Sequence, residues 1–559
     1  MIAKIAPLVR LPGSVDVFDY HIPDELSARI AAGSLVAIPF RSKTIHGVVI
    51  ETTEKTAASF RARPITDMLE EKPILSEEQI KLISRFSDHY YAPRALIVRL
   101  IVPDRPKRLS ASKETTHPVP PFLIEQQASV AIEALVAEND SLPREMRIQD
   151  LSSFLWFLKS YARKSKKGIT IIAPTIATIT LLAQTLKDQF PDRVVCYHSE
   201  MSKGQQWNAY RQSLHNAERI LISTRQGALL PLPRGGVIFI YDATSEDLKQ
   251  TDQHPRYDAR TVALWHAQYT ESSLTLVSHS ERIALKNEKP LMLPRAGGPA
   301  VRTSLIDIKR EQTASEGRTL SFSAYEHINK TLKEGKRVLI ASMRRDSEAG
   351  ISARGILKEL TDIQKNCTIG ILDTNSKNVP NSDIIIATTG SLESLKLLSE
   401  RSSIGLLLIA SIEPLLALPD FRSAERAYHK LGHLKMIAQE LRIPHLALQA
   451  FGDDNRSVRA AIFGEYEQFK AAELTSRKEL HYPPFTELIK ISQKKDSAPS
   501  VKDLMSRIPQ SSAYRVQGPY TDHNGRVSIL IKMSRPETIP LLRELSSEWI
   551  IDREPENIL

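Results

Sequence analysis

Asp242 is a single carboxylate at the end of a predicted strand, where a hydrolytic site would need two. Residues 237–240 are continuously apolar, and such a run between turn residues predicts a buried central strand of a parallel sheet. Asp242 follows this run almost at once, and the next acidic residue is Glu246. An enzyme that hydrolyses a nucleoside triphosphate needs adjacent carboxylates at such a strand end, one for magnesium and one for the attacking water. We therefore expect no catalytic magnesium site at Asp242.

The strand before Asp242 belongs to a series in which apolar runs and helical stretches alternate. This alternation is typical of parallel α/β sheets. A first series of apolar runs covers residues 169–173, 194–197, 219–223, 237–241 and 274–278, and a second covers residues 338–342, 368–372, 383–387, 404–410 and 444–448. The pattern predicts two α/β lobes in tandem, at residues 122–295 and 296–478.

The two ends of the chain have a different pattern. Short strands at residues 2–9, 15–20, 34–39 and 43–52 precede a helix at 77–89, for which Ser76 is the N-cap. They predict a β-rich module over residues 1–104, followed by a Pro- and Ser-rich linker at 105–121. Strands at 487–492, 514–516 and 527–532 with a helix at 536–548 predict a small α+β domain over 479–559.

Composition narrows the classes of protein that fit. The net charge of +10 favours a polyanionic partner. Cys196 and Cys367 lie far apart, so neither a disulfide framework nor a zinc cluster is available. The first 18 residues lack the apolar core of a signal peptide, and the longest apolar stretch, at 404–419, contains Glu413 and Pro414. We expect a cytoplasmic protein without a membrane partner.

Several segments carry a likeness to a known family. They are VFDYHIP at residues 17–23, VAIPF at 36–40, HGVV at 46–49, PRYDAR at 255–260, LPDFRSAER at 418–426, YPPF at 482–485 and IDREP at 551–555. Their order and spacing resemble the primosomal protein N′ (PriA) family of replication-restart helicases. The resemblance covers nearly the whole chain, and it implies a β-rich module that binds DNA 3′ ends, two RecA-like lobes and a C-terminal DNA-binding domain.

The chain departs from that family at the elements that would bind and hydrolyse ATP. Residues 141–161 contain no glycine, and their one Lys-Ser pair, Lys159-Ser160, stands at the far end of the segment, so they cannot form the backbone cradle of a phosphate loop. The family's Ser-Ala-Thr element reads Ser278-His279-Ser280, and its late arginine-bearing motif is replaced by LGHLKM at residues 431–436. We expect no catalytic, nucleotide-binding or metal-binding residues and no cofactor.

Two further family features are missing from the sequence. The eight zinc-binding cysteines that the resemblance places after Arg344-Arg345 are absent, and one cysteine cannot form a tetrahedral zinc site. The interval between Pro103 and Phe122 is too short for the family's winged-helix domain. Arg422, Glu425 and Arg426 keep helical spacing, and without a nucleotide site we expect them to form ion pairs between the lobes.

The resemblance implies that Phe18, Asp19 and Tyr20 hold the 3′-terminal nucleotide of a nascent strand. An ionised Asp only accepts hydrogen bonds, so it fits a 3′-hydroxyl and repels a 3′-phosphate, and aromatic faces can stack on a base. The alternative is that Phe18 and Tyr20 pack into a strand core. Arg41 replaces a family glycine and Arg63 a family lysine. The expected DNA-binding residues are Phe18, Asp19, Tyr20, Arg41, Lys43 and Arg63.

The sequence thus resembles a superfamily 2 ATP-dependent 3′–5′ DNA helicase. We expect that this chain has lost the ability to hydrolyse ATP. We expect a DNA-binding platform of replication restart that recognises branched DNA with a 3′ end. The implied partners are primosome and restart proteins, the loader of the replicative helicase and single-strand-binding protein. Two alternatives stay open: an active helicase with an atypical nucleotide site, and a scaffold protein that does not bind DNA.

Overall fold

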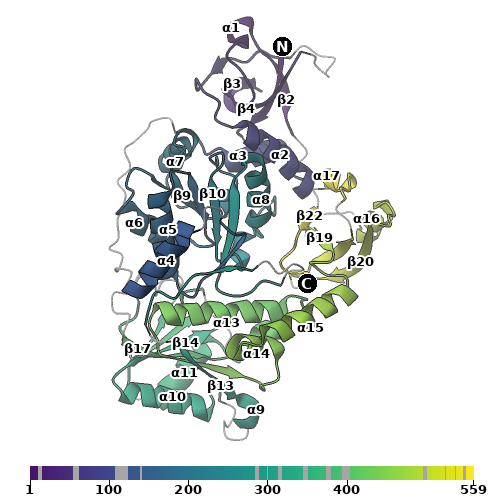
Figure 1. The fold of residues 1–559 in the computed structure, drawn as a ribbon. Coiled ribbons are helices and arrows are strands. Elements are labelled where there is room, and N and C mark those ends of the chain that lie inside the picture. The colour runs from purple at the N-terminus through teal and green to yellow at the C-terminus, as the bar shows by residue number, and fades with distance from the viewer. Residues whose placement is uncertain are drawn as a thin grey trace.

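The computed structural model describes residues 1–9, 16–54, 62–106, 124–138, 142–283, 289–298, 300–311, 318–343, 351–364, 366–372, 379–388, 390–392, 403–494, 500–522, 524–534, 537–545 and 549–558. These residues form four sheets. The N-terminal module stands at one end of the molecule and the second lobe at the other, with the C-terminal domain beside the first lobe (Figure 1).

The N-terminal module is an antiparallel sheet with the strand order β2-β1-β4-β3-β5. Its strands are β1 (Ile2–Pro7), β2 (Phe18–His21), β3 (Leu35–Phe40), β4 (Lys43–Thr53) and β5 (Asp67–Met68), and α1 (Asp24–Ser27) follows β2. Ser76 and Gln79 form a capping box at the start of α2 (Glu77–Tyr90), which α3 (Arg94–Ile101) follows. Apolar side chains of α2 pack against lobe 1, and this contact anchors the module.

Lobe 1 is a parallel sheet with the order β12-β6-β11-β10-β7-β9-β8. Its strands are β6 (Glu145–Arg147), β7 (Ile169–Ile172), β8 (Val194–Tyr197), β9 (Ile220–Ser223), β10 (Val237–Tyr241), β11 (Ser273–Ser278) and β12 (Leu291–Met292). Its helices are α4 (Gln126–Glu138), α5 (Leu151–Lys164), α6 (Ile176–Lys187), α7 (Lys203–His215), η1 (Arg225–Ala228), η2 (Glu246–Leu248) and α8 (Ala259–Thr270).

Lobe 2 is a second parallel sheet, with the order β13-β18-β17-β14-β16-β15. Its strands are β13 (Arg302–Asp307), β14 (Arg337–Ser342), β15 (Ile369–Leu372), β16 (Ile384–Thr388), β17 (Ile404–Ile409) and β18 (His445–Ala450). Its helices are α9 (Ile308–Glu311), α10 (Phe322–Lys333), α11 (Ala353–Ile363), α12 (Glu413–Leu416), α13 (Ser423–Glu440) and α14 (Arg456–Phe463). The helix α13 runs along the boundary between the two lobes (Figure 1).

The C-terminal domain follows the helix α15 (Tyr466–Glu479) and is an antiparallel sheet with the order β20-β21-β19-β22. Its elements are β19 (Glu487–Gln493), α16 (Val501–Arg507), β20 (Tyr514–Thr521), β21 (Val527–Met533), α17 (Leu541–Leu545) and β22 (Trp549–Arg553). No helix among the described residues has the length and apolar character that crossing a bilayer requires.

The predicted fold class is confirmed: a β-rich N-terminal module, two RecA-like parallel α/β lobes and a small α+β C-terminal domain. The short strands β6 and β22 were not predicted, because three to five residues give too little alternation to read. The linker expected at 105–121 lies outside the described residues from residue 107 on, as does Arg344-Arg345.

The C-terminal segment after β22 contacts the N-terminal module and both lobes. Glu554 accepts hydrogen bonds from the hydroxyls of Tyr90 in α2 (2.8 Å) and Thr261 in α8 (2.9 Å). Glu556 pairs with Arg260 of lobe 1 at 3.0 Å and with Arg422 of lobe 2. The last residues of the chain therefore contact the N-terminal module and both lobes.

Lys249 provides a test of this arrangement, because its side chain is fully buried and its ammonium lies 3.0 Å from Asp552 in β22. Replacing Lys249 by Met removes the nearer of the two cations that pair with the buried Asp552 carboxylate, the other being Arg256 at 3.5 Å, so we expect a loss of about 3 kcal/mol in unfolding free energy. Guanidinium unfolding followed by tryptophan fluorescence measures it. The double variant Lys249→Met/Asp552→Leu leaves no buried carboxylate without Lys249, and the partly exposed Arg256 can turn to solvent, so it should recover most of the loss. Equal stability of the single variant and the original chain would contradict the arrangement.

Candidate functional site

A cavity of about 700 Å³ lies between the lobes. Its wall is formed by the carboxyl ends of lobe 1 strands, by α13 of lobe 2 and by the C-terminal segment. In a doubly wound sheet, this end of the strands is where ligands bind. The cavity therefore has the position of a ligand site in such a fold.

One face of α13 contacts lobe 1 along most of the helix. The residues of this face, called the latch face below, follow one another at helical spacing: His429, His433, Met436 and Glu440. The ring of His429 hydrogen-bonds to the hydroxyl of Ser280 at 2.7 Å. Met436 lies in the apolar core of lobe 1, where its sulfur accepts a hydrogen bond from Tyr241 at 3.8 Å. The latch face holds the two lobes together.

The last residue of the latch face caps α5, the helix that follows β6. The Glu440 carboxylate accepts hydrogen bonds from the backbone N–H of Leu151 and, at 3.0 Å, from that of Ser152. Asp150 is the N-cap of the same helix and accepts from the N–H of Ser153 at 2.7 Å. Three successive amides of the first turn thus have carboxylate acceptors from the protein itself.

This turn is the connection in which the resemblance would place a phosphate loop. A free helix N-terminus binds anions because its amides lack partners and the helix dipole is positive there. Here the amides of Leu151, Ser152 and Ser153 are already occupied, and the two carboxylates add negative charge. A nucleotide phosphate would have to displace Glu440 and approach Asp150.

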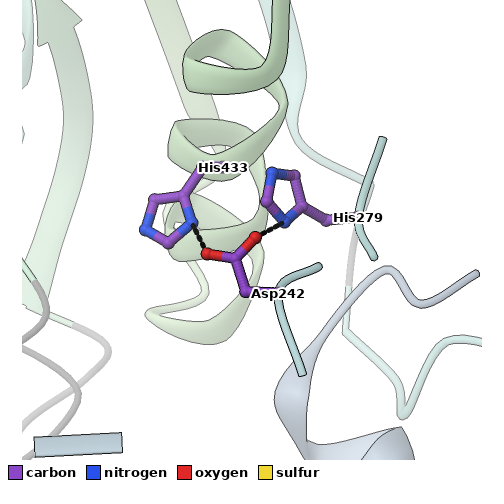
Figure 2. A group of neighbouring side chains, drawn as sticks. All are labelled: Asp242, His279 and His433. Carbon is purple, nitrogen blue, oxygen red and sulfur yellow. Dashed lines mark ion pairs between the residues drawn. The ribbon is translucent and has the colours of Figure 1, made fainter. Parts of the chain in front are cut away.

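A second contact across the boundary lies at the end of β10. Asp242 Oδ1 lies 3.3 Å from Nδ1 of His279, which follows β11, and Asp242 Oδ2 lies 3.6 Å from Nδ1 of His433 on α13. Figure 2 shows both rings turned toward the same carboxylate. Among the described residues these three form a group of possible metal ligands, with their ligand atoms within 4.8 Å of one another.

Burial sets the protonation of this group. Burial lowers the pKa of His279 to about 4, although the charge of Asp242 acts in the opposite direction. The Nε2 of His279 hydrogen-bonds to the backbone carbonyl of His429 at 3.2 Å. A carbonyl only accepts, so Nε2 carries the proton and Nδ1, the atom facing Asp242, is the basic nitrogen of a neutral ring.

Three arginines that line the cavity are paired with protein carboxylates. Arg260 pairs with Asp258 at 2.6 Å, Arg422 with Glu556, and Arg426 with Glu246 of lobe 1. The predicted ion pair between the lobes is found for Arg426, whereas Arg422 pairs with the C-terminal segment and Glu425 with Arg477 of α15. Burial alone would raise the pKa of Glu425, yet the hydrogen bond from His429 and the charge of Arg477 hold it well below its usual value.

In the N-terminal module, Phe18 and Tyr20 share one face of β2 and Asp19 lies on the other. Tyr20 is buried, and its hydroxyl donates to the Pro39 carbonyl at 3.1 Å. Half-buried Phe18 packs edge-on against Phe40, with ring centroids 5.5 Å apart. The ring of Tyr20 therefore supports the core, as the alternative interpretation expected, and has no free face for stacking.

The charged residues predicted for this module remain accessible. Asp19 is partly exposed, and no hydrogen bond or ion pair joins its carboxylate to another described residue. Arg63 donates to the Arg41 carbonyl at 3.3 Å, and the Arg41 guanidinium lies 5.8 Å from the ring of Phe40. Lys43 is exposed at the start of β4. Arg41 and Phe18 thus both lie against Phe40, and Arg63 contacts the backbone of Arg41.

Sequence reasoning missed the residues that meet at the lobe boundary. His279 and His433 were noted only as departures from family motifs, and Asp150 and Glu440 were not singled out. The helical spacing of Glu425, His429 and His433 was available in the sequence. Nothing in it, however, indicated that this face would lie against β10 and α5.

Comparisons with known proteins support the resemblance. The family profile described as the PriA 3′ DNA-binding domain (3′BD) matches residues 8–103. The chain is a relative of the PriA replication restart proteins. PriA of Chlamydia pneumoniae is 21% identical over 85% of this chain and 85% of its own. PriA of Rickettsia felis is 23% identical over 61% of this chain, and PriA of Synechocystis is 33% identical over 20% of it.

The extent of these matches differs between relatives. The chain spans about half the length of the Rickettsia felis protein, 54%, and 14% of the Synechocystis protein. Among solved structures, yeast Dbp5 bound to RNA and ADP BeF3 matches with a TM-score of 0.36 and 10% identity, over 72% of this chain and 97% of its own. RecG bound to a three-way DNA junction matches with a TM-score of 0.34 and 13% identity, over 64% of this chain and 50% of its own.

The cap on α5 gives a prediction about stability. Replacing Glu440 by Ala removes the acceptor of two buried amides, and each such donor costs about 1–3 kcal/mol. We expect Glu440→Ala to lower the free energy of unfolding by about 2–4 kcal/mol. Guanidinium unfolding followed by intrinsic fluorescence measures it, because Trp156, Trp207 and Trp265 all lie in lobe 1.

The matched control is Glu440→Gln, which keeps an acceptor oxygen and loses only the charge at the helix N-terminus. Glu440→Gln should lower the free energy of unfolding by only about 1 kcal/mol. If the Ala variant were as stable as the Gln variant, the contact between Glu440 and α5 would carry none of the stability assigned to it.

Proposed function

We propose that this chain is a DNA-binding protein of replication restart that recognises branched DNA and a 3′ end exposed at it. The observation that carries the proposal is the match of residues 8–103 to the PriA 3′ DNA-binding domain, within which Asp19 presents a partly exposed carboxylate. Relatives that match along the chain are replication restart proteins. The excess of basic residues over the whole chain suits a nucleic acid.

Asp19 has the chemistry to recognise the end of a strand. As an acceptor-only group it can take a hydrogen bond from a terminal 3′-hydroxyl, and it repels the charge of a 3′-phosphate. Arg41, Lys43 and Arg63 are exposed in the same module and can contact the backbone of the last nucleotides. Phe18 can contribute the edge of its ring, whereas Tyr20 holds β2 in place from the core.

The lobes are proposed to serve as a rigid support that no longer hydrolyses ATP. The capped amides of α5, the single carboxylate of Asp242 and the carboxylate partners of Arg260, Arg422 and Arg426 all support this. ATP hydrolysis needs a phosphate cradle, a magnesium site and cations aimed at the transferred phosphate. Each of these elements is replaced here by a contact within the protein.

A protein that recognises the fork without a motor can still act as a platform. We propose that its partners are primosome and restart proteins, including the loader of the replicative helicase and single-strand-binding protein. The support for these partners is the likeness to restart proteins.

The first experiment compares two model forks by fluorescence anisotropy, one with a leading strand ending in a 3′-hydroxyl and one ending in a 3′-phosphate. A hydrogen bond to a charged group contributes about 1.5–3 kcal/mol, so we expect at least about tenfold tighter binding to the hydroxyl. Asp19→Asn removes the charge with little change in size and should abolish the preference. Asp24→Asn, in the same module, is the matched control and should keep it.

Other results would contradict the assignment. Equal and strongly salt-dependent binding to both forks would mean that only backbone electrostatics act. The absence of measurable binding to either fork would favour the scaffold alternative.

The second experiment measures steady-state ATP turnover with the same forked DNA. We expect no DNA-stimulated hydrolysis above the buffer rate, because α5 offers no free amides to a phosphate. DNA-stimulated turnover that Asp242→Asn abolishes would instead establish the active-helicase alternative.

A further inference from the structure

The group of Asp242, His279 and His433 has the composition of a metal site. It offers two imidazole nitrogens and a carboxylate, with the three ligand atoms within 4.8 Å of one another. The side chains of Asp242, His279 and His433 are 7%, 3% and 14% exposed. Two of them come from lobe 1 and the third from α13 of lobe 2, so any ion held by the three would bridge the lobes.

The hydrogen bonding of His279 orients its ring toward Asp242. Its Nε2 donates to the His429 carbonyl at 3.2 Å, so Nδ1 is the ring nitrogen that can coordinate an ion. This Nδ1 faces the Asp242 carboxylate at 3.3 Å. A nitrogen and a carboxylate oxygen are therefore placed side by side, as two ligands of one ion would be.

The spacing fits a transition-metal ion. In a tetrahedral site with metal–ligand bonds of about 2.0–2.1 Å, neighbouring ligand atoms lie about 3.3–3.4 Å apart. The nitrogen–oxygen distances are close to this value, 3.3 Å from His279 to Oδ1 of Asp242 and 3.6 Å from His433 to Oδ2. The two rings thus face the two oxygens of one carboxylate, and an ion between them would draw the three ligand atoms, now within 4.8 Å, closer together.

Neighbouring groups orient the three ligands, as outer partners do in metal sites. The Thr244 hydroxyl donates to Asp242 Oδ1 at 3.1 Å, and the His429 carbonyl fixes the ring of His279. Gly432 lets α13 approach closely: a Cβ at this position would lie 3.1 Å from Ser280 and 3.2 Å from the His279 ring. Asp242 itself takes a left-handed conformation, with φ of 49°, that turns it out of the strand.

We propose that Asp242, His279 and His433 bind a first-row transition-metal dication such as Zn²⁺ and that the ion joins lobe 1 to lobe 2. Two imidazoles and one carboxylate suit Zn²⁺, whereas Mg²⁺ requires an octahedral set of oxygen ligands. All three residues line the cavity between the lobes, so the fourth coordination position is open to water or a small anion. The site is independent of DNA binding by the N-terminal module.

The test uses the full chain after treatment with a chelator, titrated with Co²⁺ as a spectroscopic probe and with Zn²⁺ by calorimetry. We expect one equivalent to bind, with the visible absorption of low-coordinate Co²⁺ and a higher unfolding temperature in Zn²⁺. Loss of an outer partner weakens metal sites about 10–100-fold. Loss of a ligand in His279→Gln or His433→Gln should weaken binding at least as much and remove the thermal shift.

Two further variants guard against misfolding and non-specific binding. His433→Cys replaces one ligand by another that Zn²⁺ accepts, so it should bind and add a sulfur-to-Co²⁺ absorption band. His215→Gln changes an exposed histidine away from the boundary and should leave the affinity unchanged. The proposal is overturned if the original chain binds no Co²⁺ or Zn²⁺, if His279→Gln and His433→Gln bind them unchanged, or if a tenfold excess of Mg²⁺ displaces them.

Discussion

The contact on which the arrangement of the lobes depends is that of the Glu440 carboxylate with the first turn of α5. The amides at a helix N-terminus attract an anion, and in a nucleotide-hydrolysing enzyme that anion is a phosphate. Here a side chain of the opposite lobe supplies it. With Glu440 in place, Met436 reaches the core of lobe 1 and His433 reaches Asp242, one and two turns earlier along α13. In this arrangement a protein carboxylate therefore occupies the helix N-terminus to which a phosphate could bind.

The C-terminal segment also uses carboxylates to contact other parts of the chain. Glu554 and Glu556 bring carboxylates to Tyr90, Thr261, Arg260 and Arg422, which belong to three different parts of the chain. Several segments that carry the likeness to PriA meet in this cluster. These contacts do not involve ATP, so they can hold the frame whether or not the cleft binds a nucleotide.

The sequence predicted elements with a strong local signal and missed contacts between distant segments. The strand β10 matches its predicted bounds because its five residues are all buried, and α2 begins directly after Ser76, the predicted N-cap. The same alternation that placed Phe18 and Tyr20 on one face of β2 could not tell whether that face was buried. His279 and His433 could not be paired, because their approach depends on how α13 packs on lobe 1.

The central claim is that protein carboxylates hold the lobes closed without a nucleotide. The most direct measurement is the distance between spin labels on Glu200→Cys in lobe 1 and Glu334→Cys in lobe 2, both exposed, in a chain whose Cys196 and Cys367 are replaced by Ser. The account predicts one narrow distance distribution, unchanged by Mg²⁺ with a non-hydrolysable ATP analogue and broadened by Glu440→Ala. A broad distribution that narrows or shifts when the nucleotide is added would contradict it.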